Sequence, residues 1–175
     1  MQFIRARNSF SNFTNFTKMI IGIVAIAKNF AIGKDGKLPW HYSSDLKFFK
    51  QTTTNHAVAM GFNTWKSIGK PLPNRLNIVL SRKSEIEAQP NVLLLRSREE
   101  VTALAHYLKC DVFVIGGAKT YAHFADAIDE WIVTEIPASV EDADTFMPTD
   151  FLESFELRET KNTEDDLKIK FFAKR

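Results

Sequence analysis

The stretch Ile20-Ile21-Gly22-Ile23-Val24-Ala25-Ile26-Ala27 decides the fold, because it is the longest apolar run in the chain. It spans eight residues and ends at Lys28, whereas a helix that crosses a membrane needs about 20 apolar residues. A continuous apolar run of this length is typical of a buried β-strand. We therefore expect a buried strand over residues 20–27 and no membrane-spanning segment.

Downstream of this run, short apolar segments alternate with segments of helical spacing. Further strands are predicted at residues 57–60, 76–81, 92–95, 112–116, 131–136, 154–160 and 166–173. Helices are predicted at residues 44–53, 64–68, 97–108 and 118–127. The third of these helices has a distinct start signal, since Ser97-Arg98-Glu99-Glu100 is a capping box.

The order of these segments predicts the fold class. Strands that are joined through helices form right-handed parallel crossovers. Only the polar turn at 161–166 separates the last two predicted strands, which favours an antiparallel hairpin. The predicted fold is therefore α/β: one domain with a mixed, mostly parallel central sheet of about eight strands, helices on both faces and a C-terminal antiparallel hairpin.

Composition and charge exclude several classes of protein. A chain of 175 residues, 45% of them hydrophobic, suffices for one domain with a sizeable core. A formal net charge of +2 gives no indication of a nucleic-acid partner. The single cysteine, Cys110, cannot form an internal disulfide, which fits a reducing, cytoplasmic location. The four histidines lack metal-ligand spacing, so no metal site is expected.

Residues 1–18 differ in composition from the rest of the chain. They contain four of the 15 phenylalanines, no acidic residue, and the near-repeat Asn12-Phe13-Thr14-Asn15-Phe16-Thr17. Arg5, Arg7 and the acid-free, Ser/Thr-rich composition fit an organellar targeting segment. A natural start at Met19, with an artefactual segment upstream, explains the same composition. On either interpretation residues 1–18 form an extension outside the folded domain, which is expected to span residues 19–175.

Two strands are each followed by glycine and then by a predicted helix start. The first junction carries Gly61 and the second carries Gly116 and Gly117. A helix N-terminus offers free backbone N–H groups, and glycine lets a phosphate approach the backbone closely. Two such junctions in one sheet could hold the pyrophosphate of a dinucleotide, although each taken singly is more often an ordinary turn. The glycine-rich signatures of Rossmann domains and P-loop proteins are absent.

Asp45 is the candidate catalytic carboxylate. It lies in the first turn of a predicted helix, four residues before Phe49, so the carboxylate and an aromatic ring that should be buried share one helix face. The alternative is a solvent-facing aspartate that complements the helix dipole, worth roughly 0.3–1 kcal/mol. Upstream, Leu38-Pro39-Trp40 follows the glycine-punctuated loop 32–37, which is either a mobile lid or a simple connection.

A series of short motifs runs through residues 19–175, namely Ile23-Val24-Ala25, Ile32-Gly33, Leu38-Pro39-Trp40, Asp45-Leu46-Lys47-Phe48-Phe49, Met60-Gly61-x-x-Thr64-Trp65, Ile68-Gly69-Lys70-Pro71-Leu72-Pro73-x-Arg75, Asn77-Ile78-Val79-Leu80-Ser81, Ile115-Gly116-Gly117 and Thr134. In their order and approximate spacing these motifs resemble bacterial dihydrofolate reductase. The resemblance implies an oxidoreductase that reduces 7,8-dihydrofolate to tetrahydrofolate by hydride transfer from NADPH. Such an enzyme supports one-carbon metabolism and thymidylate, purine and amino-acid synthesis, is a target of antifolates, and is mostly monomeric.

The resemblance also implies roles for individual residues in binding and reducing the substrate. Asp45 would accept two hydrogen bonds from the pteridine and favour proton delivery to N5 through a water near Trp40, with Leu38 beside them. Arg75 would bind the glutamate carboxylate of the substrate as a fork-shaped partner, with Lys70 nearby. The other residues implied in substrate binding are Ile23, Leu46, Phe49, Ile68, Leu72, Ile115, Tyr121 and Thr134, where Thr134 would support Asp45.

On the cofactor side, the resemblance implies a cis peptide bond between Gly116 and Gly117 and a set of residues that line the NADPH site. These are Ala25, Ile32, Gly33, Lys37, Gly61, Asn63, Thr64, Leu80, Ser81, Arg82, Arg96, Gly116, Gly117, Ala118, Lys119 and Thr120. One position departs from the family pattern, because Phe62 stands where many members carry the Arg or Lys that binds the ribose 2′-phosphate. Arg82 or Arg96 could supply that positive charge instead.

Two rival functions remain at this stage. The pyrimidine reductase of riboflavin synthesis is similar in fold and also uses NADPH, but it lacks Asp45 in an Asp-Leu-x-x-Phe helix together with Arg75. A catalytically silent pterin- or nucleotide-binding module would bind both ligands without turnover. Since Asp45, Trp40 and Gly116-Gly117 are all present, the enzyme is the preferred interpretation.

Overall fold

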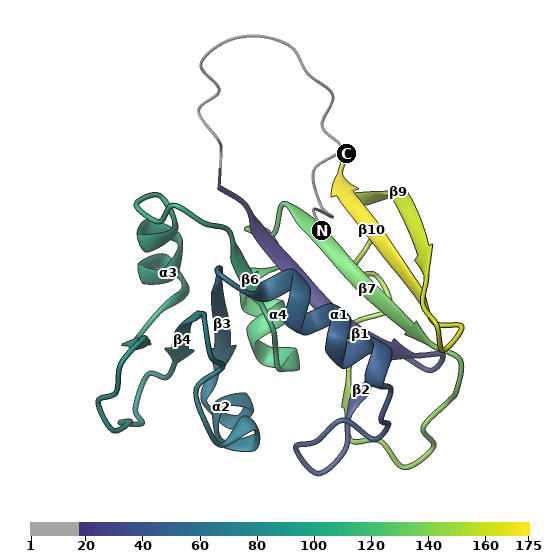
Figure 1. Cartoon of the computed structure of the whole chain (residues 1–175), viewed down its shortest axis with the longest axis horizontal. Coiled ribbons are helices and arrows are strands. Elements are labelled where there is room, and N and C mark those ends of the chain that lie inside the picture. The colour runs from purple at the N-terminus through teal and green to yellow at the C-terminus, as the bar shows by residue number, and fades with distance from the viewer. Residues whose placement is uncertain (1–17) are drawn as a thin grey trace, which may run out of the picture.

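The computed structural model describes residues 18–175, so the predicted extension lies, except for Lys18, outside the described residues. One eight-stranded sheet has the order β5-β4-β3-β6-β1-β7-β10-β9 (Figure 1). Its strands are β1 (Ile20–Ala27), β3 (Ala57–Gly61), β4 (Leu76–Leu80), β5 (Val92–Leu95), β6 (Val112–Val114), β7 (Glu130–Ile136), β9 (Phe155–Asn162) and β10 (Lys168–Lys174). The helices are α1 (Ser43–Thr53), α2 (Phe62–Ile68), α3 (Arg98–Ala105) and α4 (Ala118–Phe124).

The pairing pattern confirms the predicted mixed sheet. The strands from β5 to β7 pair in parallel, and β10 then pairs antiparallel with both β7 and β9. The predicted C-terminal hairpin is therefore β9–β10. The apolar run 20–27 is β1, which lies between β6 and β7 and has seven buried positions out of eight.

Alternating side chains of the central strands build two separate cores, one on each face of the sheet. On one face Val58 and Met60 of β3 pack with residues of α1 and α2, including Phe49 and Ile68. On the other face the intervening residues of the same strands pack with α3 and α4, for example through Phe124. Figure 1 shows α1 running across the front of the central strands. The prediction of helices on both faces is therefore confirmed.

The start of α3 follows the predicted capping box with one change. The Ser97 hydroxyl accepts from the backbone N–H of Glu100 (3.2 Å). The Glu100 carboxylate accepts from the N–H of Arg96 (2.7 Å), one residue before the cap, rather than from Ser97 itself. The helix ends at Ala105, short of the predicted residue 108, because Tyr107 N–H bonds to the carbonyl of Leu104 and tightens the last turn.

The sequence analysis missed a small second sheet and misplaced some boundaries. Strands β2 (Ala31–Gly33) and β8 (Thr145–Phe146) pair antiparallel with each other outside the main sheet. These strands have three and two residues, too short for any periodicity to identify. The strand predicted at 112–116 ends at Val114, where the chain turns into the glycine pair.

Gly22 is required by the packing of one large side chain. It pairs with Trp131 across β1 and β7, and three atoms of the Trp131 ring lie close to it. A β-carbon added at Gly22 would lie 2.5 and 2.7 Å from the Cζ3 and Cδ2 atoms of the indole. Because Trp131 is only 2% exposed, the ring has little room to move away.

Substitution Gly22→Ala is therefore expected to lower the free energy of unfolding by roughly 1–3 kcal/mol through overpacking. The measurement is urea unfolding followed by circular dichroism. Combining it with Trp131→Leu should make the alanine nearly neutral, because the smaller side chain leaves room for the methyl group. Equal destabilisation by Gly22→Ala in both backgrounds would contradict the steric explanation.

Candidate active site

A large cleft crosses the carboxyl ends of the parallel strands, where it is lined by Ala25 near the end of β1, by Gly61 and Leu80 at the ends of β3 and β4, and by Ile115 just after β6. This edge of an open α/β sheet is where such folds bind ligands. Its volume is about 1720 Å³, while a pocket for one small ligand measures roughly 300–1,000 Å³. The cleft can therefore hold two ligands side by side.

Asp45 lines this cleft from the first turn of α1. Its side chain is buried, with 8% of the residue exposed, so the alternative of a solvent-facing aspartate is wrong. Burial raises the pKa of Asp45, and a hydrogen bond with the Thr134 hydroxyl partly lowers it again. Among residues 18–175 no basic side chain pairs with this carboxylate. The site thus keeps one buried carboxylate without a counter-charge.

Arg75 is held rigidly beside the same helix. It is 6% exposed, and its Nε donates to the Thr53 hydroxyl (2.8 Å). Its two terminal nitrogens donate to the carbonyls of Pro73 (2.7 Å) and Lys50 (2.9 Å). The guanidinium also lies over the Phe49 ring, 6.0 Å from its centroid. Three of its five N–H groups are used, none of them by a carboxylate, so two remain for an anionic ligand.

The two predicted glycine junctions meet in the same cleft, at what we call its glycine end. Gly61 N–H donates to the carbonyl of Gly116 (2.9 Å), and the peptide bond between Gly116 and Gly117 is cis, as the resemblance implied. A β-carbon at Gly61 would lie 2.6 Å from the Thr120 hydroxyl oxygen, and one at Gly117 would lie 3.5 Å from that of Thr64. Glycine at these positions leaves the backbone and two hydroxyls open to a phosphate-bearing ligand.

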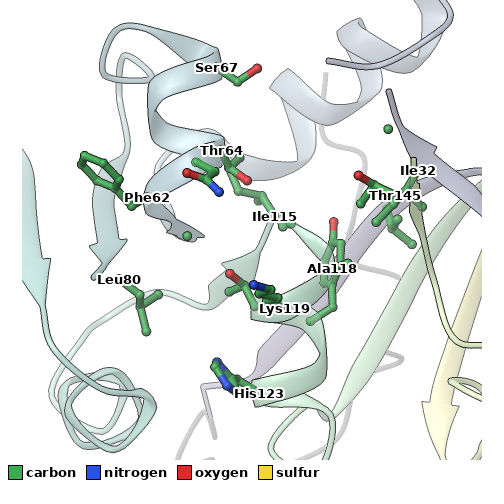
Figure 2. A pocket seen from close by; sticks show the side chains of 18 of the residues that line it. Ile32, Phe62, Thr64, Ser67, Leu80, Ile115, Ala118, Lys119, His123 and Thr145 are labelled. Carbon is green, nitrogen blue, oxygen red and sulfur yellow. The ribbon is translucent and has the colours of Figure 1, made fainter. Parts of the chain in front are cut away.

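The basic residues at this end differ in what they already bind. Arg96 donates to the carbonyls of Ser81 (3.0 Å) and Ser84 (2.8 Å) and pairs with Glu85. Arg98 pairs with Glu99 (3.3 Å) and with Asp126. Within the described part of the chain, Arg82 and Lys119 line the cleft without any acidic partner. Figure 2 shows Lys119 on α4 facing α2, where Thr64 lies.

The loop after β2 is fastened to a distant segment. Asp144 accepts from the backbone N–H of Asp35 (2.7 Å) and donates its own N–H to the carbonyl of Gly33 (3.3 Å). Lys34 pairs with Asp142 on the same two segments. The loop over the cleft is therefore set by residues more than 100 positions away, as the separation of 109 between Asp35 and Asp144 shows.

The structure brings nearly all predicted site residues to one place. Every residue assigned above to catalysis, substrate or cofactor lines the cleft except Trp40, Lys70 and Arg75. Trp40 and Arg75 are not among the lining residues, and Lys70 lines a separate hollow with Lys66, Glu85 and Glu87. Phe62 and Gly36, which the sequence placed at the phosphate position and in the 32–37 loop, also line the cleft. Further lining residues that the sequence analysis missed are Val24, Ser67, Ser84, Ser97, Arg98, Glu99, Ala122, His123, Asp126, Asp144, Thr145 and Phe146.

These features define an α/β enzyme that binds a small substrate beside a phosphate-bearing ligand. The family model of dihydrofolate reductase matches residues 19–174. The dihydrofolate reductase of Bacillus subtilis strain 168 is 39% identical over 118 residues, covering 67% of this chain and 69% of its own. That of Haemophilus influenzae strain Rd is 38% identical over 126 residues, covering 72% and 76%.

A solved structure supports the same assignment. The dihydrofolate reductase from Enterococcus faecalis, complexed with NADP(H) and RAB-propyl, superposes with a TM-score of 0.83 at 30% identity, covering 91% of this chain and 98% of its own. The chain belongs to the dihydrofolate reductase family. Its reaction is that of the family, the NADPH-dependent reduction of dihydrofolate that supplies tetrahydrofolate to one-carbon metabolism.

Burial of Asp45 gives a test that needs no ligand. The folded-state pKa of Asp45 lies above the usual value of about 3.9, so the folded state favours the protonated carboxyl. The contribution of Asp45 to the free energy of unfolding is therefore fully present below about pH 3.9 and is lost as the pH rises and the carboxyl ionises. At pH 7 the ionised carboxylate therefore destabilises the fold, and Asp45→Asn should raise the thermal midpoint. The gain should shrink as the pH falls towards 4. A gain that stays constant over this pH range would show that burial of the charge is not its cause.

Proposed function

We propose that this cleft reduces dihydrofolate with Asp45 as its central ionised group, and that the pteridine ring lies against Asp45. The observation that carries this proposal is the buried carboxylate without a counter-charge. Such a group suits a ligand that presents two adjacent N–H donors and becomes positively charged, since the ligand then supplies the missing cation. The carboxylate stabilises the protonated ring and so favours the transfer of a proton to N5.

The groups around Asp45 support the roles proposed for them. The Thr134 hydroxyl, whose hydrogen bond lowers the pKa of Asp45, is proposed to orient the carboxylate. The indole N–H of Trp40 is buried and has no hydrogen-bond partner in the protein, which suits a water that delivers the proton. The backbone carbonyls of Ile23 and Ile115 are proposed to face the pteridine, and Leu38 covers it at the mouth of the cleft.

The rest of the substrate is proposed to run along α1 towards Arg75. Leu46, Phe49, Ile68 and Leu72, which line the cleft, are proposed to form the apolar slot between Asp45 and that arginine. The two free N–H groups of Arg75 suit a bidentate contact with the glutamate carboxylate, and its anchors prevent it from turning away. Lys70 stands on a different hollow and is assigned at most a distant electrostatic contribution.

The residues at the glycine end fit NADPH. When bound, NADPH supplies the hydride that the substrate accepts at C6. We propose that Gly61, Gly116, Gly117 and the hydroxyls of Thr64 and Thr120 receive the pyrophosphate. The remaining cofactor contacts are assigned to Ala25, Ile32, Gly33, Lys37, Asn63, Leu80, Ser81, Ala118 and Lys119, which line the same cleft. Arg82 is proposed to bind the ribose 2′-phosphate, because Arg96 is already engaged with two carbonyls and Glu85.

We further propose that the catalytic domain spans residues 19–175, that the chain acts as a cytoplasmic monomer, and that residues 1–18 take no part in the reaction. The family match that begins at residue 19 and the start of β1 at Ile20 support this boundary. Among the described residues no helix has the length and apolar character to cross a membrane.

The reaction is tested by following the absorbance of NADPH when dihydrofolate is added to the purified chain, with an antifolate control. Asp45→Asn should lower turnover by roughly 100-fold or more at pH 7, because the stabiliser of the protonated ring is lost. Turnover should recover partly in acid, where the substrate arrives already protonated. Unchanged turnover at pH 7 would remove the role given to Asp45, and ligand binding without oxidation by the unaltered chain would identify a silent binding module.

The choice of cofactor is tested at Arg82. Arg82→Ala should weaken NADPH binding by roughly tenfold or more and leave NADH binding almost unchanged, because only NADPH carries the 2′-phosphate. Isothermal titration calorimetry with both cofactors measures this difference. Arg158→Ala, at an exposed arginine on β9 away from the cleft, is the matched control. An equal loss for both cofactors would show that Arg82 does not read the phosphate.

A further inference from the structure

Trp131 is the one tryptophan outside the family motifs, and the structure places it directly behind the active site. It lies on β7, is 2% exposed, and does not line the cleft. Its ring contacts Gly22 on β1, lies 5.4 Å from the ring of Tyr121 on α4, and meets Phe151 edge-on at 5.1 Å. The indole is therefore fixed on three sides, and one of these sides is a residue of the cleft.

Tyr121 connects the two ends of the cleft. Its hydroxyl donates to the carbonyl of Ile23 (2.6 Å), the group proposed to face the pteridine. Its ring edge and hydroxyl lie 3.5 Å from the point where a β-carbon of Gly116 would stand, next to the glycine pair of the cofactor end. Burial raises the pKa of Tyr121, so its hydroxyl remains a neutral donor. A shift of this ring would alter both ends of the cleft together.

The contacts of Trp131 are those of a shaped support rather than of a hydrogen-bonding group. Its indole N–H is buried and has no hydrogen-bond partner in the protein. The ring atoms that approach Gly22 take the space that any other residue would fill with a β-carbon. What Trp131 provides is therefore a flat surface of fixed thickness between β1 and Tyr121.

We infer that Trp131 is a positioning residue for the reduction of dihydrofolate: it wedges between Gly22 and Tyr121 and sets the Tyr121 hydroxyl against the Ile23 carbonyl. The effect of Trp131 on catalysis rests on the proposed function. The contacts of Trp131 with Gly22 and Tyr121 are present in the ligand-free protein and do not depend on it. Trp131 does not line the cleft, and its influence on catalysis passes through the contact between Tyr121 and Ile23.

The first test uses the full chain without ligand. With the backbone carbonyl of Ile23 labelled with carbon-13, its chemical shift reports the hydrogen bond from Tyr121. Tyr121→Phe removes the donor and should move this resonance, and Trp131→Leu should move it in the same direction. Trp131→Phe, which keeps an aromatic ring at the contact, should leave it close to its original position. An unmoved resonance in Trp131→Leu would overturn the inference whatever the protein catalyses.

The second test is a double-mutant cycle on kcat/KM for dihydrofolate. Trp131→Leu should lower kcat/KM by about tenfold, since displacements of around 1 Å in active sites have effects of this order or more. In the Tyr121→Phe background the same substitution should change kcat/KM by less than about twofold, because the group through which it acts is gone. Independent, multiplicative effects of the two substitutions would overturn the inference.

Controls separate positioning from loss of stability. Ile128→Ala removes a fully buried side chain from the same core, beside the amino end of β1 and away from the cleft. It should destabilise the fold while kcat/KM changes by less than about twofold, and Trp131→Phe should restore most of the activity lost in Trp131→Leu. A tenfold loss in Ile128→Ala would overturn the inference by showing that any core defect has this effect.

If Trp131→Leu does not fold, an unchanged carbonyl resonance and kcat/KM in Trp131→Ile overturn it equally. Failure of the unaltered chain to reduce dihydrofolate refutes the proposed function and leaves the carbonyl test standing.

Discussion

The parallel pairing of β1 with β6 on one side and β7 on the other is the constraint on which the rest of the structure depends. The register with β7 sets Ala25 opposite Thr134 and Gly22 opposite Trp131. The first pair carries a cleft residue and the hydroxyl that bonds to Asp45, and the second pair supports Tyr121 from behind. A slip of one residue would turn each of these side chains to the other face of the sheet, so the apolar run 20–27 fixes the site as well as the core.

The site is assembled at a cost in stability. Asp45 is desolvated in the cleft and has no cation to compensate it, so the ligand-free fold carries an unfavourable charge at neutral pH. The buried guanidinium of Arg75 differs from the Asp45 carboxylate, because it donates hydrogen bonds to three acceptors within the protein. The substrate can supply a compensating charge to the first group and use the spare donors of the second. In the proposed binding mode, binding energy is thereby directed to the two ends of the substrate.

The sequence predicted most of the fold because its signals are local. The run of β1, the capping box of α3 and the helical spacing of α1 are each readable within about a dozen residues, and the glycine junctions could be placed from strand order alone. The contacts of the loop after β2 could not be predicted, since Asp144 meets Asp35 across 109 positions and no local pattern marks that meeting. The support given by Trp131 was missed for a similar reason, because the contact depends on sheet register and on the absence of a side chain at Gly22.

The cofactor end shows why counting charges in a sequence is not enough to assign an anion site. Several basic residues line it, yet Arg98 is paired with Glu99 and Asp126, and Arg96 is tied to two carbonyls and Glu85. A guanidinium that already has its partners gains little from a further anion, because its desolvation and ordering have already been compensated within the protein. Arg82 and Lys119 keep their charge available to a ligand. With Phe62 uncharged, the proposed phosphate recognition therefore rests on charges at the strand end after β4 and in the first turn of α4.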